Sequence, residues 1–378
     1  MVYFCKLLSV YICSVILPDR YLSAEKCEAL TAKWKNFCAH KQVGISYAQR
    51  PIHQYQWGEG PTRVLLWSQM HGNEATTTRA LLQFFDYLNT SAASPLFSAL
   101  RLCVIPQLNP DGATVYTREN AQGIDLNRDA QNLIAPESKV LREVFDTFNP
   151  HWCFNLHDQR TIYSAGPQGP PASVSFLAPA ADPKRTNTAA RKQAMGVIAT
   201  IHKALDHHLK GGMGRYDDTF NPNCVGDYFA TQKVPTLLFE AGHFPGDYNR
   251  TTTTSYVFKA LKVALQSIAQ PNTILDYEHY FSIPENHTSY VDVLLKGVNI
   301  STALGTKKQQ QLAIQYVDKF EDASIVLQPE VHSYGASLPL RGHREFVVQK
   351  GSVALDFNLK DSLQIAKNLK KLLGKHSF

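Results

Sequence analysis

The chain has 378 residues, of which 44% are hydrophobic and 19% are charged. This composition excludes an intrinsically disordered chain and is typical of a globular protein with a large core. The formal net charge of +6 is small for this length, and no run of five or six Lys or Arg residues is present, so we expect no nucleic-acid partner.

The apolar run over residues 2–17 has the length of the core of a signal peptide, but Leu22-Ser23-Ala24 is a poor cleavage site. Three interpretations of this run remain open: it is a signal peptide, it is a packed N-terminal segment, or the start codon is misplaced. Later segments lack 18 uninterrupted apolar residues, so we expect no stable membrane insertion. Seven scattered cysteines without a Cys-x-x-Cys pair favour reduced thiols, and a cytoplasmic location is slightly favoured over export.

From residue 21 onward, short apolar runs alternate with segments of helical periodicity. Strands that are apolar throughout are typical of a parallel sheet covered on both faces. We therefore predict an α/β fold with a mixed, mostly parallel sheet flanked by helices. The predicted helices cover residues 21–37, 75–88, 140–148, 188–209 and 256–268, and the predicted strands cover 43–47, 51–57, 63–67, 100–106, 152–156 and 235–239.

The pattern changes near residue 272, where short β-like runs begin. A polar, Lys- and Gln-rich stretch around 306–320 reads as helical. We therefore predict a small α+β appendage at the C-terminal end, and its role is not indicated by the sequence. The expected division is an N-terminal segment over 1–39, a catalytic domain over 40–272 and an accessory region over 273–378.

Three polar sites follow predicted buried strands. His71 and Glu74 come after the strand that ends at Trp67, and His157 follows the strand 152–156. Open α/β sheets bind ligands at the carboxyl ends of their strands. Two histidines and one glutamate are a three-ligand set that leaves a coordination position open, which is typical of catalytic zinc. Glu240, just after the strand that ends at Phe239, is placed to deprotonate a bound water.

A fourth region lies between these sites. It contains Arg118 and the segment 123–129, in which Asp125, Asn127 and Arg128 stand close together. The guanidinium fork of arginine binds a carboxylate with two hydrogen bonds, and asparagine can donate another. Asp125 is suited to orient a ligand histidine.

As a set, these motifs resemble the zinc carboxypeptidase family, the carboxypeptidase A-like metallopeptidases. The matching residues occur in the same order over about 40–270, and the Arg-x-Asn-x-x-Gly-Ile-Asp-Leu-Asn-Arg run resembles the bacterial-type branch. They are His71, Glu74, the Asn-Pro-Asp-Gly segment 109–112, Arg118, Asp125, Asn127, Arg128, His157 and Glu240.

The resemblance implies a carboxypeptidase-like fold and one zinc ion per chain, held by His71, Glu74 and His157. Glu240 would be the general base and acid, and Arg118 would polarise the scissile carbonyl group. The implied clamp for the C-terminal carboxylate of a peptide is formed by Asn127 and Arg128, and Asp125 would support a ligand histidine.

The family's mobile tyrosine is harder to place. Tyr216 is the nearest candidate for this substrate-binding role, with Tyr228 as its rival. Two other functions remain open. A zinc deacylase of the aspartoacylase or succinylglutamate desuccinylase type, acting on N-acyl amino acids, shares several of the motifs. A non-catalytic binding protein on a peptidase fold would lack a ligand or the base, and all of these residues are present.

Overall fold

The computed structural model describes residues 15–17, 20–302, 305–348 and 355–356. The chain forms two compact units. The larger unit contains residues 21–160 and 165–287, and the smaller unit contains residues 1–20, 161–164 and 288–378. The chain passes from one unit to the other within two short strands, β7 (Tyr163–Ala165) and β11 (Asn286–Thr288).

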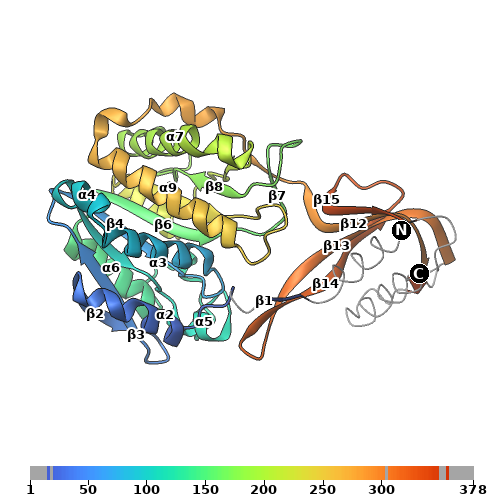
Figure 1. Ribbon diagram of the computed structural model, residues 1–378, viewed down its shortest axis with the longest axis horizontal. Coiled ribbons are helices and arrows are strands. Elements are labelled where there is room, and N and C mark those ends of the chain that lie inside the picture. The colour runs from blue at the N-terminus through green and yellow to red at the C-terminus, as the bar shows by residue number, and fades with distance from the viewer. Residues whose placement is uncertain (1–14, 18–19, 303–304, 349–354, 357–378) are drawn as a thin grey trace. The chain divides into compact units, whose positions relative to one another are not determined.

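The larger unit is built on an eight-stranded sheet with the order β2-β3-β5-β4-β6-β10-β8-β9 (Figure 1). The central strands β5, β4, β6 and β10 are parallel to one another, and the edges contain antiparallel pairs. The predicted mixed, mostly parallel sheet is therefore confirmed. The strands are β2 (Ala39–Ile45), β3 (Pro51–Trp57), β4 (Thr62–Ser68), β5 (Leu100–Ile105), β6 (Trp152–Asp158), β8 (Val174–Leu177), β9 (Met213–Arg215) and β10 (Thr236–Ala241).

Helices cover both faces of this sheet, and a separate apolar core fills each interface. Helices α3, α7 and α9 pack on one face, and α6 and α8 pack on the other. The apolar runs of the central strands are buried on both sides because each face is covered. The helices are α2 (Ala24–Thr31), α3 (Thr76–Leu88), α4 (Ser94–Ala99), α5 (Pro110–Val115), α6 (Pro136–Phe148), α7 (Ala189–Leu209), α8 (Val225–Thr231) and α9 (Thr251–Ala269).

The larger unit extends beyond the bounds expected for the catalytic domain at both ends. Before residue 40, Trp34 is fully buried in the main core and lies against Phe85, with ring centroids 3.7 Å apart. After residue 272, Tyr280 and Ile283 also enter this core. Burying side chains of this size contributes strongly to stability, so these flanking segments are part of the same folded unit.

The smaller unit contains a sheet in which β1, β14, β13, β12 and β15 follow in that order, with β16 also paired to β12. The predicted helix over 306–320 is wrong, because these residues form the long strand β13. Although Lys and Gln are good helix formers, Leu312 and Ile314 are buried between the neighbouring strands, and this pairing overrides local propensity. The strands are β1 (Val15–Leu17), β12 (Tyr290–Thr302), β13 (Gly305–Glu321), β14 (Ser324–Gly335), β15 (Arg341–Val347) and β16 (Leu355–Asp356).

Most of the apolar run over residues 2–17, considered above as a signal peptide, lies outside the described residues. Its last three residues form β1, which pairs with β14. Among the helices that the structure describes, none has the length and apolar character needed to cross a membrane.

Candidate metal centre

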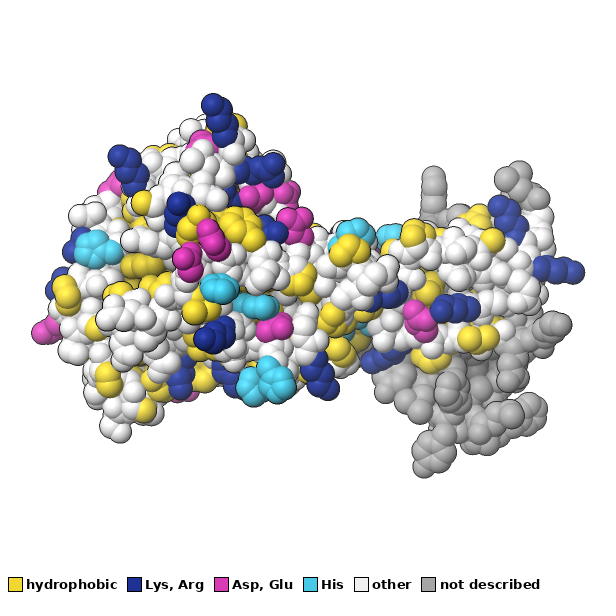
Figure 2. Space-filling model, turned by 90° about the horizontal axis from the view of Figure 1, so that it is seen from above, with side chains coloured by type: hydrophobic (Ala, Val, Ile, Leu, Met, Phe, Trp, Pro, Cys, Tyr) yellow, Lys and Arg dark blue, Asp and Glu magenta, His cyan; other side chains and the backbone are white. Residues whose placement is uncertain are grey.

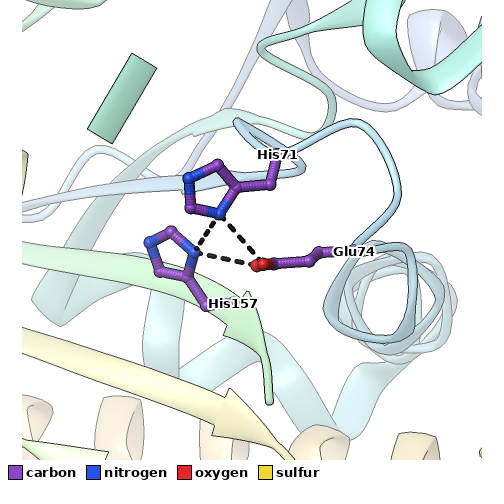
Figure 3. A group of neighbouring side chains, drawn as sticks. All are labelled: His71, Glu74 and His157. Atoms are coloured by element: carbon purple, nitrogen blue, oxygen red, sulfur yellow. Dashed lines mark hydrogen bonds and ion pairs between the residues drawn. The ribbon is translucent and has the colours of Figure 1, made fainter. Parts of the chain in front are cut away.

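Three side chains converge at the carboxyl ends of β4 and β6 (Figure 3). His71 and Glu74 lie in the loop that joins β4 to α3, and His157 is the next-to-last residue of β6. The Nδ1 atom of His71 lies 3.0 Å from Oε1 of Glu74, and Nδ1 of His157 lies 2.9 Å from Oε2 of Glu74. The two Nδ1 atoms are 3.2 Å apart.

This loop reaches its position because Gly72 has no side chain. A Cβ atom there would lie 2.0 Å from the carbonyl carbon of Gly112, which is impossible. The loop therefore packs directly against α5, whose N-cap is Asn109: its Oδ1 accepts a hydrogen bond of 2.8 Å from the Gly112 N–H. The His-Gly-Asn-Glu and Asn-Pro-Asp-Gly segments thus form one packed structure.

Asp125 fixes the orientation of His71. Its Oδ1 lies 2.9 Å from Nε2 of His71, so the imidazole donates its Nε2 proton to the carboxylate and keeps a lone pair on Nδ1. Asp125 is itself held in place, because it accepts hydrogen bonds from the Asn127 N–H (2.9 Å) and from Nε of Arg118 (3.1 Å).

The charges in the cluster suit a cation. Burial opposes ionisation of Glu74, but the two histidines outweigh it and hold the pKa of this carboxyl well below its usual range. Burial also opposes protonation of His71, yet Glu74 and Asp125 raise its pKa. For His157, burial dominates and lowers the pKa, which favours a neutral imidazole.

These residues fit a zinc ion. Zinc takes imidazole nitrogens and carboxylate oxygens at about 2.0–2.2 Å, so ligand atoms of a tetrahedral site lie about 3.3–3.4 Å apart. The two Nδ1 atoms are 3.2 Å apart, and each lies 2.9–3.0 Å from one of the two carboxylate oxygens of Glu74, so the side chains are already close to this spacing. Three protein ligands leave a fourth position for water or substrate, which is the arrangement of catalytic zinc.

Glu240 lies on β10, next to His157 in the parallel register of β6 and β10. Its side chain is buried, and Oε2 has no hydrogen-bond partner among the described residues. Burial, followed by the nearby carboxylates of Glu74 and Asp158, raises the pKa of Glu240 well above its usual range. Such a group readily takes up and holds a proton.

Asp158 was missed by the sequence analysis as a site residue, although it follows His157 directly. Its N–H donates to Oε2 of Glu74 (3.0 Å), and its carboxylate accepts hydrogen bonds from the N–H groups of Thr76 (3.0 Å) and Thr77 (3.3 Å) at the start of α3. Burial raises the pKa of Asp158, and the charge of Arg250 opposes that rise. Asp158 thereby connects the end of β6 to the loop that carries His71 and Glu74.

Arg118 lies at the edge of the cluster, with 40% of its side chain exposed. Besides its contact with Asp125, its Nη1 lies 3.3 Å from Oε1 of Glu74. A guanidinium in this position is close to the metal ligands and accessible to a substrate oxygen.

Asn127 and Arg128 follow Asp125 and face the start of α8. Oδ1 of Asn127 accepts a hydrogen bond of 3.0 Å from the Val225 N–H. Arg128 is exposed, and its Nη1 lies 2.8 Å from the carbonyl oxygen of Asn127 and 3.1 Å from Sγ of Cys224. The sequence had no signal for this thiol contact, because the two residues are 96 positions apart.

The two tyrosine candidates have different surroundings. The ring of Tyr228 lies under the guanidinium of Arg142, at 3.9 Å, and packs against the apolar core of its sheet face. Tyr216 follows β9, and its N–H donates to the carbonyl of Phe176 (2.8 Å). Its side chain is only partly buried, as a substrate-binding role would require.

Asp227, in the first turn of α8, is a second group that the sequence analysis missed. Burial raises its pKa from an ordinary value of 3.8 to about 6, although Arg128 and Arg191 oppose the rise. Between these pH values the folded protein binds more protons than the unfolded chain, so Asp227 lowers the free energy of unfolding as the pH rises from 3.8 to 6.

We therefore expect Asp227→Asn to stabilise the protein above pH 6, by about 1–2 kcal/mol, and to have no such effect below pH 4. Asparagine keeps an oxygen for the hydrogen bond that Oδ2 accepts from the Asn221 N–H. Urea unfolding at several pH values measures the difference, with the exposed Asp146→Asn as the matched control. A stability difference that stayed constant with pH would contradict this expectation.

Figure 2 shows histidine side chains beside acidic and basic side chains on one face of the larger unit. On the face drawn, Lys and Arg side chains are scattered among other residues and do not form a continuous stripe.

The zinc carboxypeptidase family model matches residues 24–173 of the chain. Carboxypeptidase 2 of Trichophyton rubrum is 31% identical over 108 residues, which are 28% of this chain and 20% of that protein. The matched segment thus spans about a fifth of the length of this curated relative. Of the residues proposed for the site, Tyr216 and Glu240 lie outside the family match and the others lie within it.

Solved structures show the same fold at low sequence identity. A metallo-carboxypeptidase from Burkholderia cenocepacia aligns with a TM-score of 0.54 at 15% identity, covering 67% of this chain and 70% of that one. Bovine thrombin-activatable fibrinolysis inhibitor, solved with a tick carboxypeptidase inhibitor, aligns with a TM-score of 0.54 at 13% identity, covering 67% and 99%. The resemblance seen in the sequence is therefore confirmed: residues 24–173 match the model of the zinc carboxypeptidase family, and the chain shares its fold with solved metallo-carboxypeptidases.

Proposed function

We propose that this protein is a zinc-dependent metallocarboxypeptidase that hydrolyses the C-terminal amide bond of peptides. The observation that carries the proposal is the convergence of His71, Glu74 and His157 next to the buried carboxyl of Glu240, whose Oε2 has no hydrogen-bond partner in the described part of the chain. A three-ligand metal site with an adjacent proton acceptor is the arrangement that metal-assisted hydrolysis requires.

The proposal assigns the proton transfers to Glu240. Zinc, when bound by the three ligands, supplies a Lewis acid and lowers the pKa of its water toward about 7. Oε2 of Glu240 takes the proton of the attacking water and returns it to the nitrogen of the leaving amine. The upward shift of the Glu240 pKa, caused first by burial, supports this role, because a carboxyl of raised pKa holds a proton more readily than an ordinary glutamate does.

The proposal assigns stabilisation of the scissile carbonyl oxygen to Arg118 and binding of the terminal carboxylate to Arg128 and Asn127. Arg118 is placed beside Glu74 and is partly exposed, so it can donate hydrogen bonds to the scissile carbonyl oxygen as negative charge develops there. The exposed guanidinium of Arg128 and the amide of Asn127 are suited to hold the terminal carboxylate of the substrate. The substrate in this proposal is a peptide with a free C-terminal carboxylate.

Digestion of peptides with free and amidated C-termini tests the carboxylate clamp. We expect amidation to lower kcat/KM by about 100-fold or more, because a neutral amide loses the charge-assisted hydrogen bonds to Arg128. In Arg128→Gln, the ratio of kcat/KM for the free peptide to kcat/KM for the amidated peptide should fall toward one. Mass spectrometry of a digested peptide library would read the side-chain preference in the same experiment.

Equal cleavage of free and amidated peptides would contradict the clamp. N-acyl amino acids are assayed in parallel, because the deacylase alternative predicts that they are hydrolysed and that peptides are not. A zinc content below about 0.1 per chain after zinc repletion would instead support the non-catalytic alternative.

A further inference from the structure

Arg250 is a buried arginine that lies beneath the ends of the two strands carrying His157 and Glu240. Its side chain is 2% exposed. Nη1 donates to the carbonyl oxygen of Ala241 (2.8 Å), and Nη2 donates to the carbonyl oxygen of Gln159 (2.9 Å). Ala241 directly follows Glu240, and Gln159 follows His157 by two positions, so one guanidinium links the ends of β6 and β10.

The same strand ends make one further direct contact. The N–H of Gln159 donates to the carbonyl of Ala241 (2.9 Å), so this oxygen receives hydrogen bonds from both Gln159 and Arg250. Hydrogen bonds to a charged donor are stronger than neutral ones. The contact therefore fixes the two strands at the point where their pairing ends and where backbone motion would otherwise be largest.

The local fold around Arg250 is built to hold this side chain in place. Arg250 is the N-cap of α9 and has a left-handed backbone conformation (φ 59°), which is unfavourable for a residue with a Cβ atom. Asp247 supports the turn, because its carboxylate accepts hydrogen bonds from the N–H groups of Thr251 (3.0 Å) and Thr252 (2.7 Å). A strained residue that is fixed by its surroundings is typical of a functional constraint.

The contacts of Arg250 reach the metal ligands through the backbone. Gln159 directly follows Asp158, and the N–H of Asp158 donates to the Glu74 carboxylate. The backbone contacts of Arg250 therefore act on the elements that hold His157, Glu74 and Glu240, although Arg250 touches none of these three residues in the contacts described above.

We propose that Arg250 is a positioning residue that sets the placement of Glu240 relative to the His71–Glu74–His157 cluster, through the carbonyl groups of Ala241 and Gln159. This inference rests on the proposed function, since it takes Glu240 as the proton acceptor of the reaction. A misplacement of about 1 Å at a reacting group can lower a rate by about 100-fold, so loss of this link should affect turnover more than substrate binding.

The test compares Arg250→Gln with Arg250→Lys, and Arg191→Gln is the matched control. Arg191 is 4% exposed and likewise donates to two backbone carbonyls, those of Ala178 (3.1 Å) and Arg185 (2.6 Å), but it contacts neither β6 nor β10 in these bonds. For each variant, kcat and KM are measured on a peptide with a free C-terminus, zinc affinity is measured by chelator competition, and Tm is recorded.

We expect Arg250→Gln to lower kcat by about 10- to 100-fold with KM within about threefold of wild type, and to weaken zinc binding by about 10-fold or more. Arg250→Lys, which keeps the charge and a donor, should recover part of kcat. Arg191→Gln should lower Tm by an amount similar to that in Arg250→Gln. Its kcat and zinc affinity should stay within about threefold of the wild-type values.

Wild-type kcat in Arg250→Gln, or an equal loss of kcat in Arg191→Gln, would overturn the positioning role. If the glutamine variant does not fold, the lysine variant decides: reduced kcat with unchanged KM supports the inference, and wild-type kcat refutes it. If wild-type protein cleaves no peptide, the proposed function fails. The inference about Arg250 is then judged on zinc affinity alone, where unchanged binding in both Arg250 variants would refute it.

Discussion

Replacing Glu240 by glutamine is expected to abolish hydrolysis while leaving zinc bound. The substitution keeps the size of the side chain but removes its ability to accept a proton, and general acid–base catalysis contributes about 10²–10⁴-fold to a rate. We therefore expect kcat to fall by about 10³-fold. Since Glu240 supplies no ligand atom to the His71–Glu74–His157 cluster, zinc content should stay at the wild-type value.

The measurement combines peptide hydrolysis with metal analysis of the same preparation. Glu240→Gln should fold at least as well as wild type, because a neutral amide removes a carboxyl that burial and neighbouring carboxylates disfavour in its charged form. Glu143→Gln, at an exposed position of α6, is the control for a lost carboxylate elsewhere. Wild-type turnover in Glu240→Gln would exclude Glu240 as the proton acceptor.

Replacing His157 by glutamine is expected to remove zinc. The variant keeps only His71 and Glu74 of the three ligand side chains, and the site would lose zinc affinity by several orders of magnitude. Zinc content after dialysis should fall from about one per chain to below 0.1, with a parallel loss of hydrolysis. A ligand that binds the folded state stabilises it, so the variant should also lose the rise in Tm that zinc gives the wild-type protein.

His207→Gln is the matched control, because His207 is exposed on α7 and lies outside the cluster. It should retain zinc, hydrolysis and the zinc-dependent rise in Tm. A chelator that strips zinc from the wild-type protein should abolish hydrolysis, and added zinc should restore it. Retention of one zinc per chain in His157→Gln would show that the ion is held by other residues.

The central sheet could be predicted from the sequence because its strands are short and apolar throughout. The pattern that identifies β4, β6 and β10 also locates the polar residues that follow them, since the carboxyl ends of parallel strands meet at one edge. His71, His157 and Glu240 can be identified from the sequence for this reason. Glu74 followed from its spacing to His71.

Other features could not be predicted because they depend on contacts that are distant in the chain. Arg250 contacts Gln159, which is 91 positions away, and a lone arginine at the end of a turn has no local pattern that points to this contact. The strand β13 was predicted as a helix because its Lys- and Gln-rich start favours helix locally, whereas its neighbours in the sheet decide its conformation. Tyr280 belongs to the main core although it lies in the region 273–378, which the sequence pattern assigns to the appendage.

The parallel register of β6 and β10 limits which changes in chain length the protein can tolerate. His157 and Glu240 are direct neighbours across these strands, and side chains alternate between the two faces of a strand at every residue. Deleting one residue within Trp152–Leu156 would therefore turn His157 to the opposite face or shift it away from Glu240. Insertions and deletions that preserve the site are expected in the loops between the strands, and the two strands themselves should keep their lengths.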